Sequence, residues 1–209
     1  MPPDILLAFD TSAAHCAAAL VLDGQVTLAF EAMEKGQAER LMPLLEELLA
    51  SAGVGWSDLT AIAVGTGPGN FTGVRIAVAA ARGLALGLGI PAIGVTRLEA
   101  VAFGLPRPLT VIEDARRGQV YVQDFSETGA GVARIADIGD LGAVLPRQTG
   151  SAAVEALAAA MPLAEAIARI AAARMGGDHP RPAPFYLRGA DAAPPSDPPP
   201  VILPDPVLL

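Results

Sequence analysis

The sequence predicts an α/β fold made of two related lobes. Three observations lead to this prediction. Three strand patterns in a row open the chain, two apolar helix patterns separated by a strand follow them, and a shorter strand-rich half comes after Gly104–Pro108. We therefore expect a first lobe over residues 1–105, a second lobe over 106–193 and a proline-rich tail over 194–209.

The first three strands are expected to form one sheet. Ile5–Asp10 is a short apolar run that ends in Asp-Thr-Ser. Cys16–Leu22 and Gln25–Phe30 flank Asp23-Gly24, a residue pair typical of a two-residue hairpin turn. The opening of the chain is therefore predicted to be a strand followed by a β-hairpin.

Two helices complete the first lobe. Leucines from Leu41 to Leu49 recur at helical spacing and predict a helix near Ala38–Ala52, and Pro43 places its start near Glu39. After a strand at Leu59–Val64, the run Phe71–Leu88 is apolar on nearly every side, which predicts burial on all sides, against a neighbouring helix or another chain.

The rest of the chain alternates short strands and helices. We expect strands at Ala92–Val95, Leu109–Ile112, Val120–Phe125 and Gly131–Ile135, and helices at Arg97–Phe103, Ala152–Ala160 and Leu163–Arg174. Ten of the nineteen prolines lie in the last 32 residues of the chain, and this end is expected to be extended, and partly disordered past Pro194.

Composition narrows the classes of function. The net charge is −8 and the pI about 4.7, so the chain as a whole repels phosphodiester backbones. Cys16 is the only cysteine, and the amino-terminal residues lack the basic region of a signal peptide. We expect a cytoplasmic protein without a membrane span.

The glycine-rich stretch Gly65–Arg75 lies between a predicted strand and a predicted helix. It matches neither a Walker A loop nor a dinucleotide fingerprint. One interpretation is a nucleotide site in which Gly67 and Gly69 act with Asp10, Thr11 and Ser12; the other is that the glycines only permit close packing. The residues alone favour close packing.

The sequence contains no convincing catalytic set. His15 and Cys16 are neighbours on a strand, so their side chains point to opposite faces. Glu113-Asp114 at a strand end is compatible with a cleft but is also an ordinary solvated turn. We therefore predict no catalytic residue and no metal site.

Five motifs in this order resemble the TsaB (YeaZ) family, which takes part in making threonylcarbamoyladenosine (t6A) on tRNA. They are ILLAFDTS (Ile5–Ser12), ERLMPLLEELL (Glu39–Leu49), GTGPGNFTGVRIAVAAARGLA (Gly65–Ala85), EDARRGQVYV (Glu113–Val122) and PFYLRGADA (Pro184–Ala192).

The resemblance implies an actin-like, Hsp70-like, sugar-kinase-like (ASKHA) fold with a reduced second lobe. It implies a non-catalytic subunit that binds the transferase TsaD through its first two helices, reaches TsaE through that pair, forms a homodimer when alone and meets tRNA only indirectly. No cofactor is expected to be required; ATP or ADP would bind weakly or at the interface of the complex. The partner contacts are expected at Leu41, Leu45, Leu48, Val74, Ala77, Val78, Ala81, Leu84 and Ala85.

The sequence departs from the family in one place and leaves one alternative. Gln37-Ala38 stands where the family usually has His-Ser, whereas Glu39 matches. The metal-binding His-x-x-x-His that TsaD carries on its first helix is absent from the corresponding stretch. The alternative is an enzyme of the same fold, an ATP-dependent phosphotransferase or a peptidase, because Asp10-Thr11-Ser12 is retained.

Overall fold

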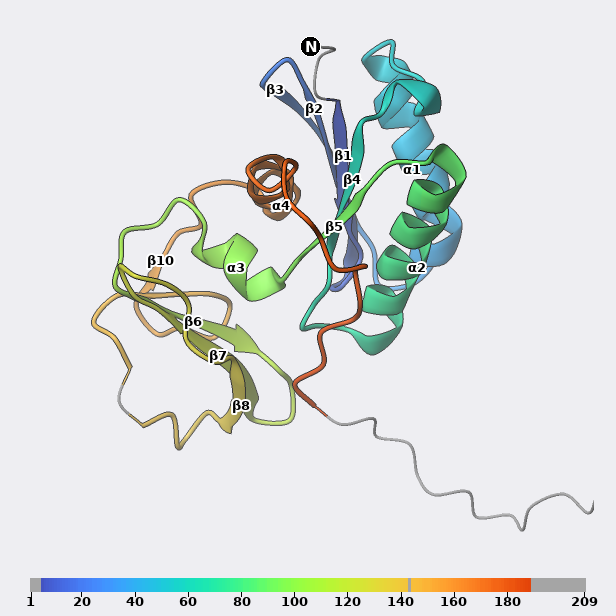
Figure 1. The fold of residues 1–209 in the computed structure, drawn as a ribbon. Coiled ribbons are helices and arrows are strands. Elements are labelled where there is room, and N and C mark those ends of the chain that lie inside the picture. Colours follow the sequence, from blue (N-terminus) through green and yellow to red (C-terminus); the bar gives the residue numbers. More distant parts are fainter. Residues whose placement is uncertain (1–4, 143, 189–209) are drawn as a thin grey trace, which may run out of the picture.

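The structure is a computed structural model that describes residues 5–142 and 144–188. Figure 1 shows two lobes, each built on a sheet, with helices α1 and α2 on the outer side of the first. The predicted tail, 194–209, lies outside the described residues.

The first-lobe sheet has the strand order β3-β2-β1-β4-β5. β1 pairs antiparallel with β2 and β2 with β3, whereas β1, β4 and β5 run parallel. The predicted opening strand and hairpin are confirmed. The strands are β1 (Leu6–Asp10), β2 (His15–Leu22), β3 (Gln25–Ala32), β4 (Ala61–Gly65) and β5 (Ala92–Val95).

Helices cover both faces of this sheet. Leu7 and Phe9 of β1 point into a core beneath α1 (Gln37–Ser51) and α2 (Phe71–Leu88). Leu6 and Ala8, on the other face, pack against α4 (Leu163–Ala172). Successive side chains of a strand alternate between faces, so a strand this buried needs a helix on each side. A short 3₁₀ helix, η1 (Trp56–Asp58), follows α1.

The second lobe repeats the first in shortened form. Its strand order, β10-β9-β6-β7-β8, places an antiparallel meander beside parallel strands, as in the first sheet. Helix α3 (Arg97–Ala102) joins the lobes by packing on both α4 and β6. The strands are β6 (Leu109–Asp114), β7 (Gln119–Phe125), β8 (Arg134–Asp137), β9 (Gln148–Thr149) and β10 (Ala156–Leu157).

The predicted helix at Ala152–Ala160 is wrong. Part of this stretch forms β10, and Thr149 Oγ1 donates to Leu157 O at 2.8 Å. Ala152 and Ala153 pack against the second-lobe core, but residues 154–160 are exposed, so the segment lacks an apolar stripe of helical spacing and helix propensity alone does not decide its conformation.

Two boundaries also differ from the prediction. α1 begins at Gln37, two residues before Glu39, and accommodates Pro43 in its second turn. α4 was assigned to the second lobe, yet it packs on β1, β2 and β4 of the first-lobe sheet. Its apolar stripe covers the alanine-rich face that α1 and α2 leave bare, which is why the chain returns to the first lobe.

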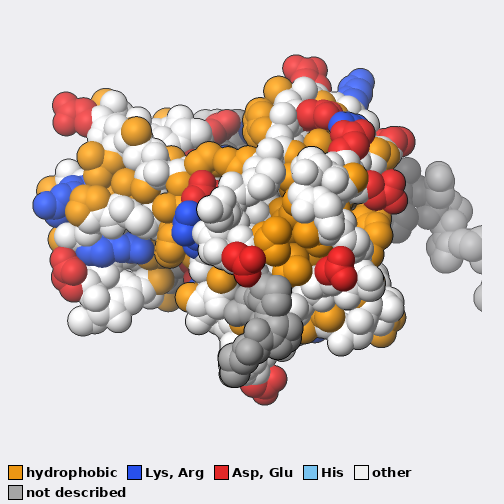
Figure 2. Space-filling model, turned by 90° about the horizontal axis from the view of Figure 1, so that it is seen from above, with side chains coloured by type: hydrophobic (Ala, Val, Ile, Leu, Met, Phe, Trp, Pro, Cys, Tyr) orange, Lys and Arg blue, Asp and Glu red, His pale blue; other side chains and the backbone are white. Residues whose placement is uncertain are grey.

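Helix α2 is buried on one side only. By length and hydropathy it would pass as a membrane span, a test that core helices also pass, and its inner face packs on the sheet. Its outer face exposes Ala79, Gly83 and Leu86, of which Leu86 is 79% exposed. On the first lobe, seen from above, acidic side chains stand around exposed apolar ones (Figure 2).

The predicted partner contacts were therefore chosen on the wrong face of both helices. An apolar stripe marks the side that meets the chain's own sheet, and eight of the nine residues lie in its core. Leu84 is half-buried. The buried eight are Leu41, Leu45, Leu48, Val74, Ala77, Val78, Ala81 and Ala85.

Gly83→Ala is expected to raise the free energy of unfolding by about 0.5–1 kcal/mol, because alanine favours the helix and restricts the unfolded chain. A Cβ at Gly83 would meet nothing within 4 Å. Gly89→Ala is the control: its Cβ also has open space, but Gly89 ends α2 with φ +70°, so alanine should lower stability by about 1 kcal/mol. Urea unfolding measures both; shifts of the same sign would contradict this account.

Candidate functional site

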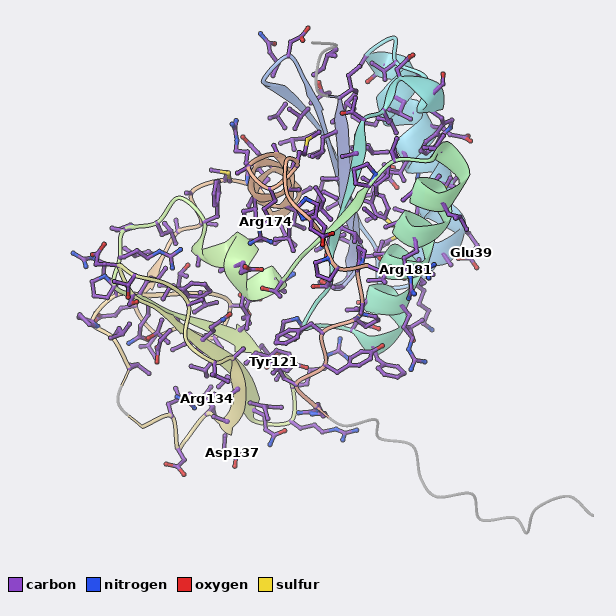
Figure 3. All side chains as sticks on the ribbon, viewed as in Figure 1. Glu39, Tyr121, Arg134, Asp137, Arg174 and Arg181 are labelled. Atoms are coloured by element: carbon purple, nitrogen blue, oxygen red, sulfur yellow. The ribbon has the colours of Figure 1, made fainter. Side chains whose placement is uncertain are left out.

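A cleft of about 820 Å³ lies between the two lobes. Most of its lining comes from the turn after β1, the glycine-rich turn with the start of α2, the β6–β7 hairpin and the C-terminal segment 185–188, and Arg97 and Ser151 complete it. Figure 3 shows Tyr121 of β7 beside the C-terminal segment, whereas Glu39 lies on the far side of α1 and α2, away from the cleft.

Asp10 ends β1 and is fully buried. Its Oδ1 accepts hydrogen bonds from Ser12 N (3.0 Å), Ser12 Oγ (2.9 Å) and His15 Nε2 (2.9 Å). Burial by itself raises the pKa of Asp10, but the hydrogen bond from His15 and the positive charge of Arg97 outweigh it and hold the pKa below its ordinary value. Asp10 is therefore a buried carboxylate that holds its own turn.

The glycine-rich turn packs directly on the Asp10 turn. A Cβ at Gly69 would overlap the carbonyl oxygen of Ser12, and one at Gly73 would overlap that of Thr11. Thr11 Oγ1 donates to Gly73 O at 2.7 Å, and Asn70 N donates to Ser12 O at 2.6 Å. These glycines permit two backbone segments to touch, as the close-packing interpretation requires.

Only some of the residues predicted for a nucleotide site line the cleft. Ser12 and Gly69 line the cleft, but Asp10, Thr11 and Gly67 do not. Asp10 Oδ2 instead lies against Gly65, where a Cβ would overlap it. A carboxylate turned away from the cleft does not fit a metal-bound phosphate in it. Among residues 5–142 and 144–188, no group of three or more His, Cys, Asp or Glu could hold a metal ion.

Some of the backbone amides at the start of α2 already have hydrogen-bond partners. The side chain of Asn70 accepts from Thr72 N (3.0 Å) and Gly73 N (3.2 Å) and so caps the helix. Two of the amides that a bound phosphate would use at a helix N-terminus are therefore already paired within the chain.

An ion pair crosses from one lobe to the other. Arg97 Nε donates to Glu113 Oε2 at 2.6 Å, and Glu113 Oε1 accepts from Ser151 N at 2.8 Å. Burial would lower the pKa of Arg97, but the charges of Glu113 and Asp10 outweigh it and raise the pKa. Arg97 Nη1 is buried and has no hydrogen-bond partner among the described residues.

The C-terminal segment ties both lobes to the cleft. Phe185 N donates to Thr66 O at 2.8 Å in the first lobe, and Arg75 Nε donates to Tyr186 Oη at 2.9 Å. Arg188 Nη2 donates to Gln119 of β7 in the second lobe. Both side walls of the cleft are thus held by the same stretch of chain.

Sequence reasoning named Glu113 and His15 but missed Arg97 and the partners of all three residues. His15 was considered only as a partner for Cys16, whereas its partner is Asp10, five residues back. Arg97 follows β5 and Glu113 lies near the end of β6, so both stand at strand ends. A search for opposite charges at the ends of strands in the two lobes would have found this pair.

Comparison with known proteins identifies relatives of this chain. A family model described as TsaD, tRNA N6-adenosine threonylcarbamoyltransferase, matches residues 31–155. The chain is 39% identical over 133 residues to the tRNA threonylcarbamoyladenosine biosynthesis protein TsaB of Escherichia coli (strain K12), a match that covers 61% of the chain. The chain spans little more than half of that relative's length, 57%.

Two further matches extend over nearly the whole chain. A protein of Mycobacterium tuberculosis (strain ATCC 25618 / H37Rv) described as uncharacterized is 35% identical over 199 residues, which cover 90% of this chain and 94% of that one. The solved structure of YeaZ from Pseudomonas aeruginosa superposes with a TM-score of 0.72 at 29% identity, covering 88% of this chain and all of the other.

Gly73→Ala is expected to lower the free energy of unfolding by at least about 2 kcal/mol, because the new Cβ would overlap the Thr11 carbonyl. Gly83→Ala in the same helix is the matched control, since its Cβ has open space. Urea unfolding of the two variants measures the difference. A Gly73→Ala variant as stable as the parent would show that the two turns do not need this contact.

Asp10→Asn tests the buried carboxylate. The pKa of Asp10 is lower in the folded than in the unfolded chain, so its charge stabilises the fold above about pH 4 and this contribution is lost as the pH falls through the folded-state pKa. We expect the variant to be less stable than the parent near pH 7, with the difference shrinking below about pH 4. Unfolding curves across this range measure it, with the exposed Asp178→Asn as control. A difference independent of pH would argue against the assignment.

Proposed function

The chain belongs to the TsaB (YeaZ) family and has its actin-like ASKHA fold, and we propose that it is a non-catalytic subunit of the complex that makes t6A on tRNA. In this proposal it binds the transferase TsaD, and TsaE joins through the pair that they form. It forms a homodimer when TsaD is absent, and it acts in the cytoplasm, where tRNA is modified.

The observation that carries the proposal is the outer face of α2, which we define as Ala79, Gly83, Leu86 and Gly87. All four residues are exposed, and Ala79, Gly83 and Gly87 recur every four residues along one side of the helix. A Cβ at Gly83 or Gly87 would meet nothing within 4 Å. A stripe this small lets the backbone of a partner helix come close, and the 79% exposed Leu86 gives it an apolar side chain to bury.

The proposal that the subunit is non-catalytic draws support from the Asp10 turn. An ATP-dependent phosphotransferase of this fold would need the carboxylate after β1 to face the cleft, but Asp10 Oδ1 accepts from Ser12 and His15, and Oδ2 is buried against Gly65, outside the cleft lining. Cys16 offers no reactive thiol to a peptidase mechanism, because burial raises its pKa to about 11. We propose that no cofactor is required and that ATP or ADP binds only weakly, or at the interface with TsaD.

Ala79→Arg and Gly83→Arg are expected to abolish co-purification with the cognate TsaD and to remove t6A formation in a reconstituted reaction. Each places a charged side chain in the helix contact, and neither disturbs the core because both positions are exposed. Thermal unfolding should show that both variants fold normally. Affinity pull-down and the t6A content of the tRNA are the measurements.

Val132→Arg is the matched control, since Val132 is apolar, 91% exposed and in the second lobe. We expect it to bind TsaD like the parent. Outer-face variants that still bind TsaD and support t6A formation would overturn the proposal.

A further inference from the structure

We infer that the mouth of the interlobe cleft binds the single-stranded loop of an RNA. This inference rests on the proposed function, because tRNA is then the substrate of the complex, and it replaces an indirect contact with a direct one. The binding surface, which we call the rim, consists of Phe71, Arg75, Arg116, Tyr186 and Arg188.

The charge of the cleft is opposite to that of the protein. Four arginines and two carboxylates line it, a net charge of +2 in a chain whose net charge is −8. Three of the arginines belong to the rim, and Arg97 lies deeper beside Glu113. Field lines concentrate in a cleft with walls of low dielectric, so this is where a polyanion meets the chain favourably. The overall charge, which argues against RNA binding, does not describe this site.

An exposed aromatic pair stands at the same mouth. Phe71 at the start of α2 is 41% exposed and Tyr186 of the C-terminal segment 43%, with ring centroids 5.1 Å apart. The Arg75 guanidinium lies 3.7 Å from the centroid of the Phe71 ring. Exposed aromatic rings beside arginines are how proteins stack unpaired bases while they hold the phosphates.

The β6–β7 hairpin brings Arg116 to the rim in an unusual backbone conformation. Arg116 and Arg117 both have positive φ, +63° and +54°, in a turn that Gly118 completes. A non-glycine residue in this region costs about 1 kcal/mol, so a glycine or asparagine would suit the turn better. The placement of Arg116, which lines the cleft, is explained if its side chain binds a ligand.

The cleft also carries a buried donor that no group in residues 5–142 and 144–188 uses. Arg97 Nη1 has no hydrogen-bond partner among the described residues, although its atom is buried. A phosphate oxygen or a base carbonyl entering past the rim would satisfy it. The site therefore offers stacking at its mouth and a charged donor at its floor.

A loop fits this site better than a duplex or a free nucleotide. A duplex laid across the surface would approach a chain whose net charge is −8, whereas an unpaired base can enter the positively charged cleft alone. A magnesium-bound nucleotide would need a carboxylate free to face it, but Glu113 is paired with Arg97 and Ser151, and Asp114 Oδ1 accepts from Arg116 N.

The test measures binding of a labelled RNA hairpin with a single-stranded loop, by fluorescence anisotropy over a range of salt concentrations. It uses the full chain, alone and assembled with TsaD. The double variant Arg116→Ala/Arg188→Ala should weaken binding by about tenfold or more and reduce the salt slope by about 1.4, the value for two single-strand phosphates. Phe71→Ala should weaken binding about fivefold or more, whereas Phe71→Trp, which keeps a stacking ring, should retain it.

Arg134→Ala is the control for the loss of a positive charge outside the rim. Arg134 lies on β8, and Figure 3 shows it on the side of the second lobe away from the first. Because Arg134 is expected to contact no phosphate, its loss should leave the RNA affinity within about twofold of the parent and the salt slope unchanged. The blunt duplex of the same stem and ATP with magnesium are the comparison ligands, and both should bind more weakly than the hairpin.

Rim variants that leave RNA affinity unchanged in both preparations would overturn the inference, as would an equal loss in Arg134→Ala. Displacement of the RNA by ATP with magnesium would make the cleft a mononucleotide site and also overturn it. If the rim variants fail this test while they still co-purify with TsaD, the inference falls and the proposed function stands.

Discussion

The rest of the structure depends on the contact between two turns at the end of the first-lobe sheet. Gly73 and Gly69 lie so close to the carbonyls of Thr11 and Ser12 that no side chain fits at either glycine. This contact sets where α2 begins and how it lies on the sheet. One face of α2 then fills the core, and the opposite face is presented to solvent as the outer face.

The width of the cleft is set by contacts of a different kind. Arg97 and Glu113 hold the lobes together from inside, and the C-terminal segment holds them from the rim through Thr66 and Gln119. The ion pair between the partly exposed Arg97 and the buried Glu113 would have to break for the lobes to separate, which supports the proposal of a subunit that presents fixed surfaces.

Local patterns in the sequence predicted the hairpin, α1 and α2, and the motifs predicted the family and its function. Turn pairs, apolar spacing and motifs all depend on residues that are close together in the sequence. The face of α2 that we propose as the partner contact was not predictable in this way, since apolar spacing marks the side that meets the sheet. Nor was the Asp10–His15 pair, which depends on the strand and the turn meeting in space. The false helix at Ala152–Ala160 shows that alanine content without a face to bury is a weak guide.

The packing of α4 on the first-lobe sheet matters for biosynthesis. Leu6, Ala8 and the small residues beside them remain uncovered when the first 102 residues have been made, because the helix that covers them begins at Leu163. At ribosomal rates of about 5–20 residues per second, this delay lasts roughly 3–12 s. A nascent chain with an uncovered apolar sheet is a substrate for chaperones, and the second lobe is in effect an insertion that must be synthesised before the first can close.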